Sequence, residues 1–292
     1  NSDGDEQSFE SLNGRIIDPL TDPTAVATRY RHDTFSARLG GRIHVTDSIS
    51  LLLSGAYRLR DFEENITTVG DARIDAAYDV NRLTGYTSGL SNLYSEALLT
   101  IDGREKLERY HSTASPSMGY LISGFYGFQA ALTEEDPSEF GRWGVDLQRY
   151  INLYRGDRIL VLRLYFEGVT GSLEEVPFID LPALGGPVFL RGYRRDRFRE
   201  RNIGLASVEY QYPISRNIRG YLFVDAGAPY RTSEDLRNWH EAPRIAYGGG
   251  LQFNTISSFI GRIIIGTNID GGFQATFSFN PTFETTSRED NQ

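Results

Sequence analysis

Apolar and polar residues alternate along most of the chain. In the clearest stretch Phe35, Ala37, Leu39, Gly41, Ile43 and Val45 alternate with Ser36, Arg38, Gly40, Arg42, His44 and Thr46. A period of two places successive side chains on opposite faces of a strand, and a helix does not produce it. The stretch therefore predicts a strand with one apolar and one polar face.

The same alternation recurs to the end of the chain and predicts twelve strands. Their apolar faces fall within residues 35–45, 49–59, 72–80, 93–101, 120–130, 143–147, 160–166, 206–212, 222–226, 245–253, 259–265 and 273–279. Several of these stretches approach the roughly 9 to 11 residues that cross a bilayer at a tilt. Single-chain outer-membrane barrels have an even number of strands. The pattern favours an all-β fold, a transmembrane antiparallel β-barrel of about twelve strands.

The connections between the predicted strands agree with this fold in most places. If both termini are periplasmic, the long connections at 83–92, 169–202 and 228–243 are extracellular, whereas the turns at 215–217 and 254–256 are periplasmic. Long connections outside and short turns inside are usual in such barrels. The 61–70 connection is an exception, because it would be long on the periplasmic side while the 46–48 turn outside would be short.

Three regions are expected along the chain. Residues 1–30 are acidic and rich in turn signals, and they predict a polar tail or a short plug. Residues 31–280 carry the alternating pattern and form the barrel, and residues 281–292 form a polar C-terminal tail.

A soluble β-sandwich or a lipocalin-like barrel would also alternate, with the apolar face turned inward. Two features weigh against both folds. The polar faces carry many Arg, Asp and Glu residues, and the strands are too numerous for one small core.

Composition narrows the class of protein further. The mean hydropathy is -0.38, and no run of about 18 apolar residues marks a membrane helix. This excludes a helical membrane protein but not a barrel, whose strands average to a polar composition. With no Cys, the chain has neither disulfides nor a thiol-based metal site. A net charge of -9 argues against nucleic acid as a partner.

The connection at 169–202 is too long for a hairpin turn, and such loops are often functional. It contains Leu184-Gly185-Gly186 and, further on, Leu190-Arg191-Gly192-Tyr193. One interpretation is a Gly-rich surface loop. The other is a loop folded into the lumen, where its Arg is neutralised.

The order of motifs around this loop resembles a known family. Pro116 to Tyr120 and Arg158 to Arg163 precede the loop, and Val208 to Ile214 and Phe223 to Gly227 follow it. Together they are similar to the carboxy-terminal barrel of the BamA, TamA and FhaC superfamily, also called the bacterial surface antigen family. The resemblance spans roughly residues 110 to 280 and implies a barrel of the Gram-negative outer membrane, related to protein insertion and translocation.

In that family the Arg at the loop tip lies inside the barrel and meets acidic residues on the two following strands. Carried over, the tip is Arg191, Gly192 and Tyr193, and the partners are Glu209 and Asp225. Strand parity agrees, because each carboxylate alternates with apolar neighbours and so faces the lumen.

The sequence also departs from the family. Its barrels usually have 16 strands and follow periplasmic POTRA domains, which predicts a short form lacking those domains here. The last predicted strand is followed by polar residues, Pro281 to Gln292, where the family has a terminal aromatic residue.

Three functions remain to be weighed. The first is an assembly or translocation barrel that works with membrane lipids, a protein client, a partner subunit or a second copy of itself. The second is a passive or plugged pore. The third, a hydrolase, lacks support, because His32, His44, His111 and His240 sit in unrelated contexts without a recognisable nucleophile or metal spacing. We expect no enzyme activity, no cofactor and no metal.

Overall fold

A computed structural model describes most of the predicted barrel. The described residues are 9–10, 16–17, 28–29, 31–62, 72–74, 80–105, 116–133, 136, 138–154, 158–171, 175–238, 244–255 and 259–279. Most of the expected N-terminal tail, His111, His240 and the tail at 281–292 lie outside them.

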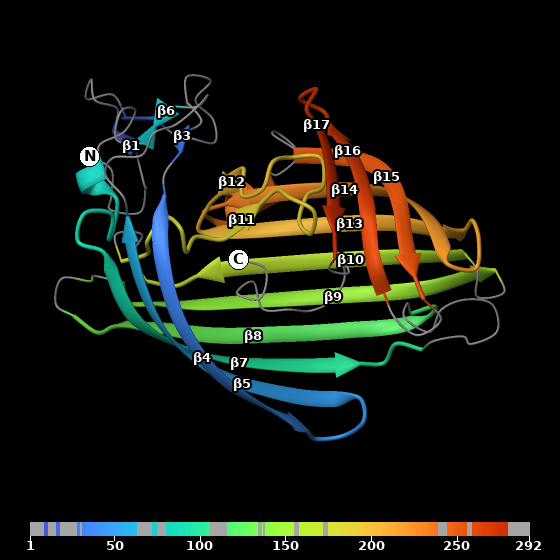
Figure 1. Ribbon diagram of the computed structural model, residues 1–292, viewed down its shortest axis with the longest axis horizontal. Helices are drawn as coiled ribbons and strands as arrows, with labels where there is room; N and C mark the ends of the chain where they lie inside the picture. Colours follow the sequence, from blue (N-terminus) through green and yellow to red (C-terminus); the bar gives the residue numbers. More distant parts are fainter. Residues whose placement is uncertain are drawn as a thin grey trace.

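The described residues form one large antiparallel sheet of eleven strands (Figure 1). In chain order these are β4 (His32–His44), β5 (Ile49–Phe62), β7 (Leu90–Asp102), β8 (Gly119–Ala131), β9 (Phe140–Tyr154), β10 (Arg158–Val169), β13 (Asn202–Pro213), β14 (Ile218–Tyr230), β15 (Arg244–Asn254), β16 (Phe259–Asn268) and β17 (Phe273–Ser278). Each strand pairs with its neighbour in this order, so the sheet is an up-and-down meander. Within the described part, β4 and β17 are the outermost strands.

Burial on this sheet is the reverse of that in a soluble protein. Apolar side chains on one face are exposed, among them Leu99, Leu164, Val208, Leu222, Val224 and Phe277. Charged and polar side chains on the other face are buried, among them Glu96, Arg142, Asp146, Arg163, Glu167 and Arg262. A sheet with this arrangement is stable when lipid covers its apolar face. The fold is a transmembrane β-barrel with a polar interior.

The predicted strand at 72–80 is wrong. β5 pairs with β7 along its length, from Ile49↔Ile101 to Arg60↔Leu90, so no strand lies between them. Ala72–Arg73 (β6) instead makes a short parallel pair with Thr28–Arg29 (β3). Ile74 packs in a small apolar cluster with Leu83, Tyr86, Leu90, Phe178 and Ile179, which buries it away from lipid. Val80 of this prediction packs against the same cluster, and Ala76 and Tyr78 lie outside the described residues.

This correction also removes the exception among the connections. β4 begins, and β5 ends, at the end of the sheet that carries the long connection between β10 and β13, so the connection from β5 to β7 begins and ends there as well. The turn at 45–48 joins the short turns at the opposite end. The first strand therefore runs in the direction opposite to the one expected. At the short-turn end, the connection at 103–118 is longer than its neighbours.

The smaller elements lie outside the large sheet. β1 (Phe9–Glu10) pairs with β2 (Ile16–Ile17), and a 3-10 turn, η1, spans Val80–Arg82. α2 (Ser233–Arg237) follows β14, and Thr232 and Asp235 form a capping box at its start. No helix in the described residues is long and apolar enough to cross a membrane.

The connection between β10 and β13 folds back into the curve of the sheet (Figure 1). It contains a two-residue hairpin pair, β11 (Ala183–Leu184) with β12 (Phe198–Arg199). Leu184, Leu190 and Arg191 of this loop are almost fully buried. We call residues 170–201 the inserted loop.

Candidate functional site

Glycines shape the tip of the inserted loop. Gly185 (φ 120°) and Gly192 (φ 109°) adopt a backbone conformation that L residues rarely take. A Cβ atom on Gly192 would lie 2.6 Å from the carbonyl oxygen of Thr267 on β16, and one on Gly185 would collide with the carbonyl oxygen of Arg194. The backbone of the loop thus approaches the barrel wall and itself more closely than a side chain would allow.

Apolar side chains pack the loop against the wall on either side of the tip. Leu184, Leu190, Tyr193 and Phe198 form a buried cluster with wall residues Tyr165, Ile203, Leu205 and Ala246. Leu190 is also at φ 63°, unusual for a residue other than Gly, and its side chain is fully buried. Burial of this cluster offsets the cost of the strained backbone.

Arg191 lies between these apolar contacts, and both its backbone and its guanidinium group form hydrogen bonds with the barrel wall. Its backbone N–H donates to Oδ2 of Asp225 at 2.9 Å, its Nε donates to the same oxygen at 2.9 Å, and Nη2 donates to Oδ1 at 2.8 Å. Nη2 also donates to the hydroxyl of Ser207 at 3.1 Å, and Nη1 donates to Glu209. Every N–H edge of the guanidinium therefore meets a wall residue.

A second arginine on the wall completes the cluster. Nη2 of Arg262 on β16 donates to both oxygens of Glu209, each at 3.0 Å. Oε1 of Glu209 also accepts from Gln211 at 2.8 Å. The cluster thus holds two guanidinium and two carboxylate groups. Since these charges balance, the groups can be held together away from water.

Two aromatic rings lie beneath the guanidinium groups. Cζ of Arg191 is 3.8 Å from the ring centroid of Phe223, and Cζ of Arg262 is 3.9 Å from that of Tyr221. Phe223 is directly opposite Glu209 in the register of β13 and β14. Cation–π contacts of this kind are stronger away from water, and here all the groups are buried.

The residues that follow Arg191 also contact β15, β16 and the short turn after β16. The carbonyl oxygen of Gly192 accepts from Nδ2 of Asn268 at 2.7 Å, and the hydroxyl of Tyr193 donates to Asp270 at 3.0 Å. The Arg191, Gly192 and Tyr193 triplet is therefore held by β13, β14, β15, β16 and the turn that follows β16.

The base of the loop is held by a separate ion pair. Nη1 of Arg60 on β5 donates to both oxygens of Asp180, at 2.8 and 2.7 Å. Burial on its own would raise the pKa of Asp180, but the charges of Arg60 and Arg58 outweigh burial and lower that pKa below its usual value. This pair ties the loop to the side of the barrel opposite Asp225.

Several of these contacts were not identified from the sequence. Ser207 and Arg262 have the strand parity of lumen residues, so the sequence does contain a signal for them. Asp180 carried no such signal, because it lies in an irregular segment. Among the described residues, no group of three or more His, Cys, Asp or Glu side chains could hold a metal ion.

Comparison with known proteins establishes the family. The sequence matches the Omp85 superfamily domain over residues 110–264, more than half of the chain, and the chain belongs to that superfamily. It is accordingly a bacterial outer-membrane β-barrel related to protein insertion and translocation barrels.

A solved structure of low sequence identity shares the fold. BamA from Haemophilus ducreyi lacking POTRA domains 1–3 matches with a TM-score of 0.60 at 15% identity, over 85% of this chain and 55% of that one. CdiB from Acinetobacter baumannii matches with a TM-score of 0.48 at 12% identity, over 85% of this chain and 41% of that one. The chain thus spans about half the length of the BamA structure. Among the curated proteins, none matches it.

Proposed function

We propose that this protein aids the assembly or transport of proteins at the outer membrane, with Arg191 locking the inserted loop inside the barrel. The observation that carries this proposal is the buried cluster of Arg191, Glu209, Asp225 and Arg262. An arginine taken out of water is retained only where carboxylates offset its desolvation. Here its fork also fixes the position of the loop.

With the inserted loop held in the lumen by Arg191, activity on other proteins would take place at the barrel wall. A small barrel whose lumen holds a packed loop leaves little room for a polypeptide. Strand β4 is different, because all but one of its thirteen residues are exposed and, in the described part of the chain, it pairs with β5 alone. An edge of this length can pair with another strand. A client protein, a partner subunit or a second copy of this chain would bind there.

The alternative is a passive or plugged pore that keeps the loop without any activity on proteins. Reconstituted protein separates the two functions. Proteoliposomes containing the wild-type chain should accelerate the insertion of an unfolded outer-membrane protein, whereas a passive barrel would leave the spontaneous rate unchanged.

The lock itself is tested by single-channel conductance in planar bilayers. We expect the wild-type protein to show little steady current, and Asp225→Asn to open channels because the loop loses its main partner. Arg194→Gln, which changes an exposed arginine of the same loop, is the matched control and should remain closed. A steady open current in the wild-type protein would favour the pore.

A further inference from the structure

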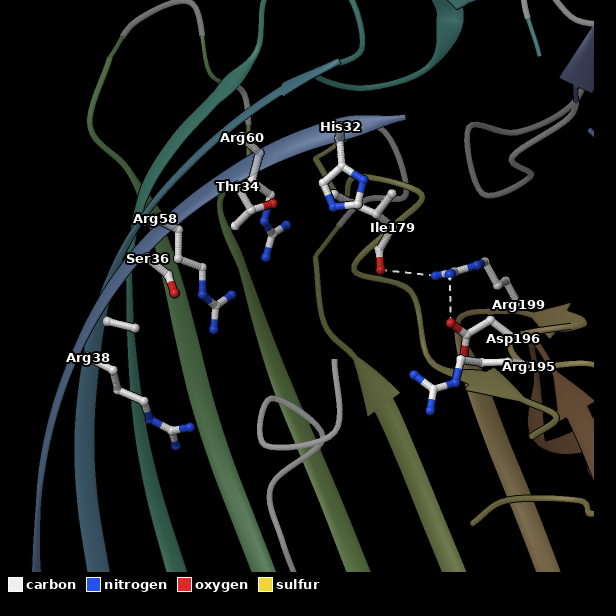
Figure 2. A pocket seen from close by; sticks show the side chains of 11 residues that line it. His32, Thr34, Ser36, Arg38, Arg58, Arg60, Ile179, Arg195, Asp196 and Arg199 are labelled. Carbon is white, nitrogen blue, oxygen red and sulfur yellow. Dashed lines mark hydrogen bonds and ion pairs between the residues drawn. The ribbon is translucent and has the colours of Figure 1, made fainter. Parts of the chain in front are cut away.

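A second group of arginines surrounds a cavity at the loop-bearing end of the barrel. The cavity has a volume of about 350 Å³ and lies between β4, β5 and the inserted loop (Figure 2). Five arginines line it: Arg38, Arg58, Arg60, Arg195 and Arg199. We call it the arginine pocket. Its residues are separate from the Arg191 cluster.

Positive charge exceeds negative charge at this pocket. Among the lining residues the five arginines face one carboxylate, Asp196. Two further carboxylates contact these arginines, Asp180 at 2.7 Å from Arg60 and Glu96 at 4.0 Å from Arg38. Among the described residues, arginines are therefore the majority of the charged groups at the pocket. The chain as a whole has the opposite sign, with a net charge of -9.

Several of these arginines are held in place by the surrounding structure. Asp180 accepts both hydrogen bonds from Arg60, and Cζ of Arg58 lies 4.4 Å from the ring centroid of Tyr94. Nη1 of Arg199 donates to the carbonyl oxygen of Ile179 at 3.0 Å, and Nη2 donates to Asp196 at 3.2 Å. Donors fixed in advance lose little conformational entropy when a ligand binds.

The side chains converge from two parts of the barrel. Figure 2 shows the guanidinium groups of Arg38 and Arg58 projecting from the strands into the space that Arg195 enters from the loop. Thr34 and Ser36 add hydroxyl groups on β4. Guanidinium forks and hydroxyls together match the oxygens of a phosphate group.

We propose that the arginine pocket binds a phosphate-bearing anion. A phosphate monoester carries about two negative charges at neutral pH, and guanidinium groups that converge on one cavity can offset that charge. A cavity of about 350 Å³ also has room for the group that bears the phosphate. That group can belong to a soluble molecule or to a lipid headgroup, since either presents the same oxygens.

Binding of pyrophosphate to the purified protein in a non-ionic detergent tests the proposal by titration calorimetry. Arg195→Gln on the loop and Arg38→Gln on β4 each remove one cation from the pocket; Arg195 is exposed and Arg38 is half-buried. Each should weaken binding by about tenfold or more, the loss expected for one charge-assisted contact. Arg194→Gln is the matched control, an exposed arginine of the same loop outside the pocket, and should bind as the wild type does.

A second measurement distinguishes the source of the phosphate. Protein is mixed with vesicles of phosphatidylcholine alone or with added phosphatidic acid, and pyrophosphate is tested as a competitor. Tight binding of free pyrophosphate identifies a soluble ligand. Binding to phosphatidic acid that the two pocket variants lose, without tight binding of pyrophosphate, identifies a headgroup.

Two results would overturn the proposal. One is the absence of binding to both pyrophosphate and phosphatidic acid in the folded wild-type protein. The other is equal weakening in Arg194→Gln and in the two pocket variants, because binding would then reflect the general charge of the loop.

Discussion

Arg191 binds Asp225 through both its backbone and its side chain, with the backbone N–H and Nε each 2.9 Å from Oδ2. The two contacts do different work. The contact with the side chain of Arg191 lets the Asp225 carboxylate neutralise the guanidinium charge. The contact with the backbone fixes the peptide at the loop tip against β14. Loss of this one carboxylate therefore both leaves a buried charge without its main partner and frees the chain that carries it.

Asp225→Asn should expose the inserted loop to trypsin, which cleaves after arginine and has six such sites in residues 191–201. Breaking a buried ion pair costs about 3–5 kcal/mol. The rate of cleavage within residues 170–201, measured in reconstituted vesicles, should rise at least tenfold. Arg191→Ala should have the same effect, whereas Arg194→Gln should not. Unchanged cleavage in both Asp225→Asn and Arg191→Ala would disprove the lock.

Glu209 should be coupled to both arginines that it contacts. In a double-mutant cycle, Glu209→Gln and Arg262→Gln are each expected to destabilise the barrel, and the double variant should cost less than their sum. The coupling should be about 0.5–3 kcal/mol, the range for residues in one ion-pair network. Urea unfolding in detergent measures it. Additive effects would show that Arg262 does not contribute to the cluster.

Gly192→Ala should be strongly destabilising. Its φ of 109° and the approach of Thr267 leave no place for a methyl group, and β16 would have to move. We expect a loss of about 1–3 kcal/mol in the free energy of unfolding, the cost of a strained backbone conformation. Gly41→Ala is the control, because nothing lies within 4 Å of a Cβ at that position. Equal stability of the two variants would contradict the close approach of loop and wall.

The Arg60–Asp180 pair should make attachment of the loop sensitive to acid. The folded pKa of Asp180 lies below its unfolded value of about 3.9, so the pair stabilises the fold fully above that pH. The contribution is then lost as pH falls through the folded pKa. Asp180→Asn should lower the urea midpoint at pH 7 and flatten its decline below about pH 4. The control is Asp47→Asn in the exposed turn after β4; if it changes the profile equally, the pair is not the cause.

Much of the fold is readable from the alternation of residues, because both faces of a membrane strand have strict requirements. The segment at 72–80 shows where this reasoning fails. Ile74 alternates with polar residues as a lipid-facing residue would, yet it packs against Phe178 and Ile179 of the inserted loop. A period of two predicts a strand-like segment, but it does not predict whether lipid or another part of the protein covers the apolar side chains.

The site was readable in part for a similar reason. Parity places Glu209 and Asp225 on the same face as Ser207, a relation that the sequence contains. The contact between Arg262 and Glu209 is different, since two strands separate β16 from β13 and the curvature of the sheet brings them together. No local pattern encodes that approach. Nor does any local pattern predict the contact between Asp180 and Arg60, because Asp180 lies in an irregular segment and is 120 residues from Arg60 in the chain.

Adjacent residues on one strand of the barrel face opposite surroundings, lipid on one side and a packed polar interior on the other. Ile265 of β16 is 48% exposed, whereas Ile264 is 3% exposed and packs with Tyr221 and Phe223 beneath the two arginines. Because the chain has no Cys, Ile265→Cys and Ile264→Cys each provide a single site for a bimane label. In vesicles of brominated lipids, the label at position 265 should be strongly quenched and the label at 264 should not. Equal quenching at both positions, or quenching at 264 alone, would contradict this orientation of the barrel wall.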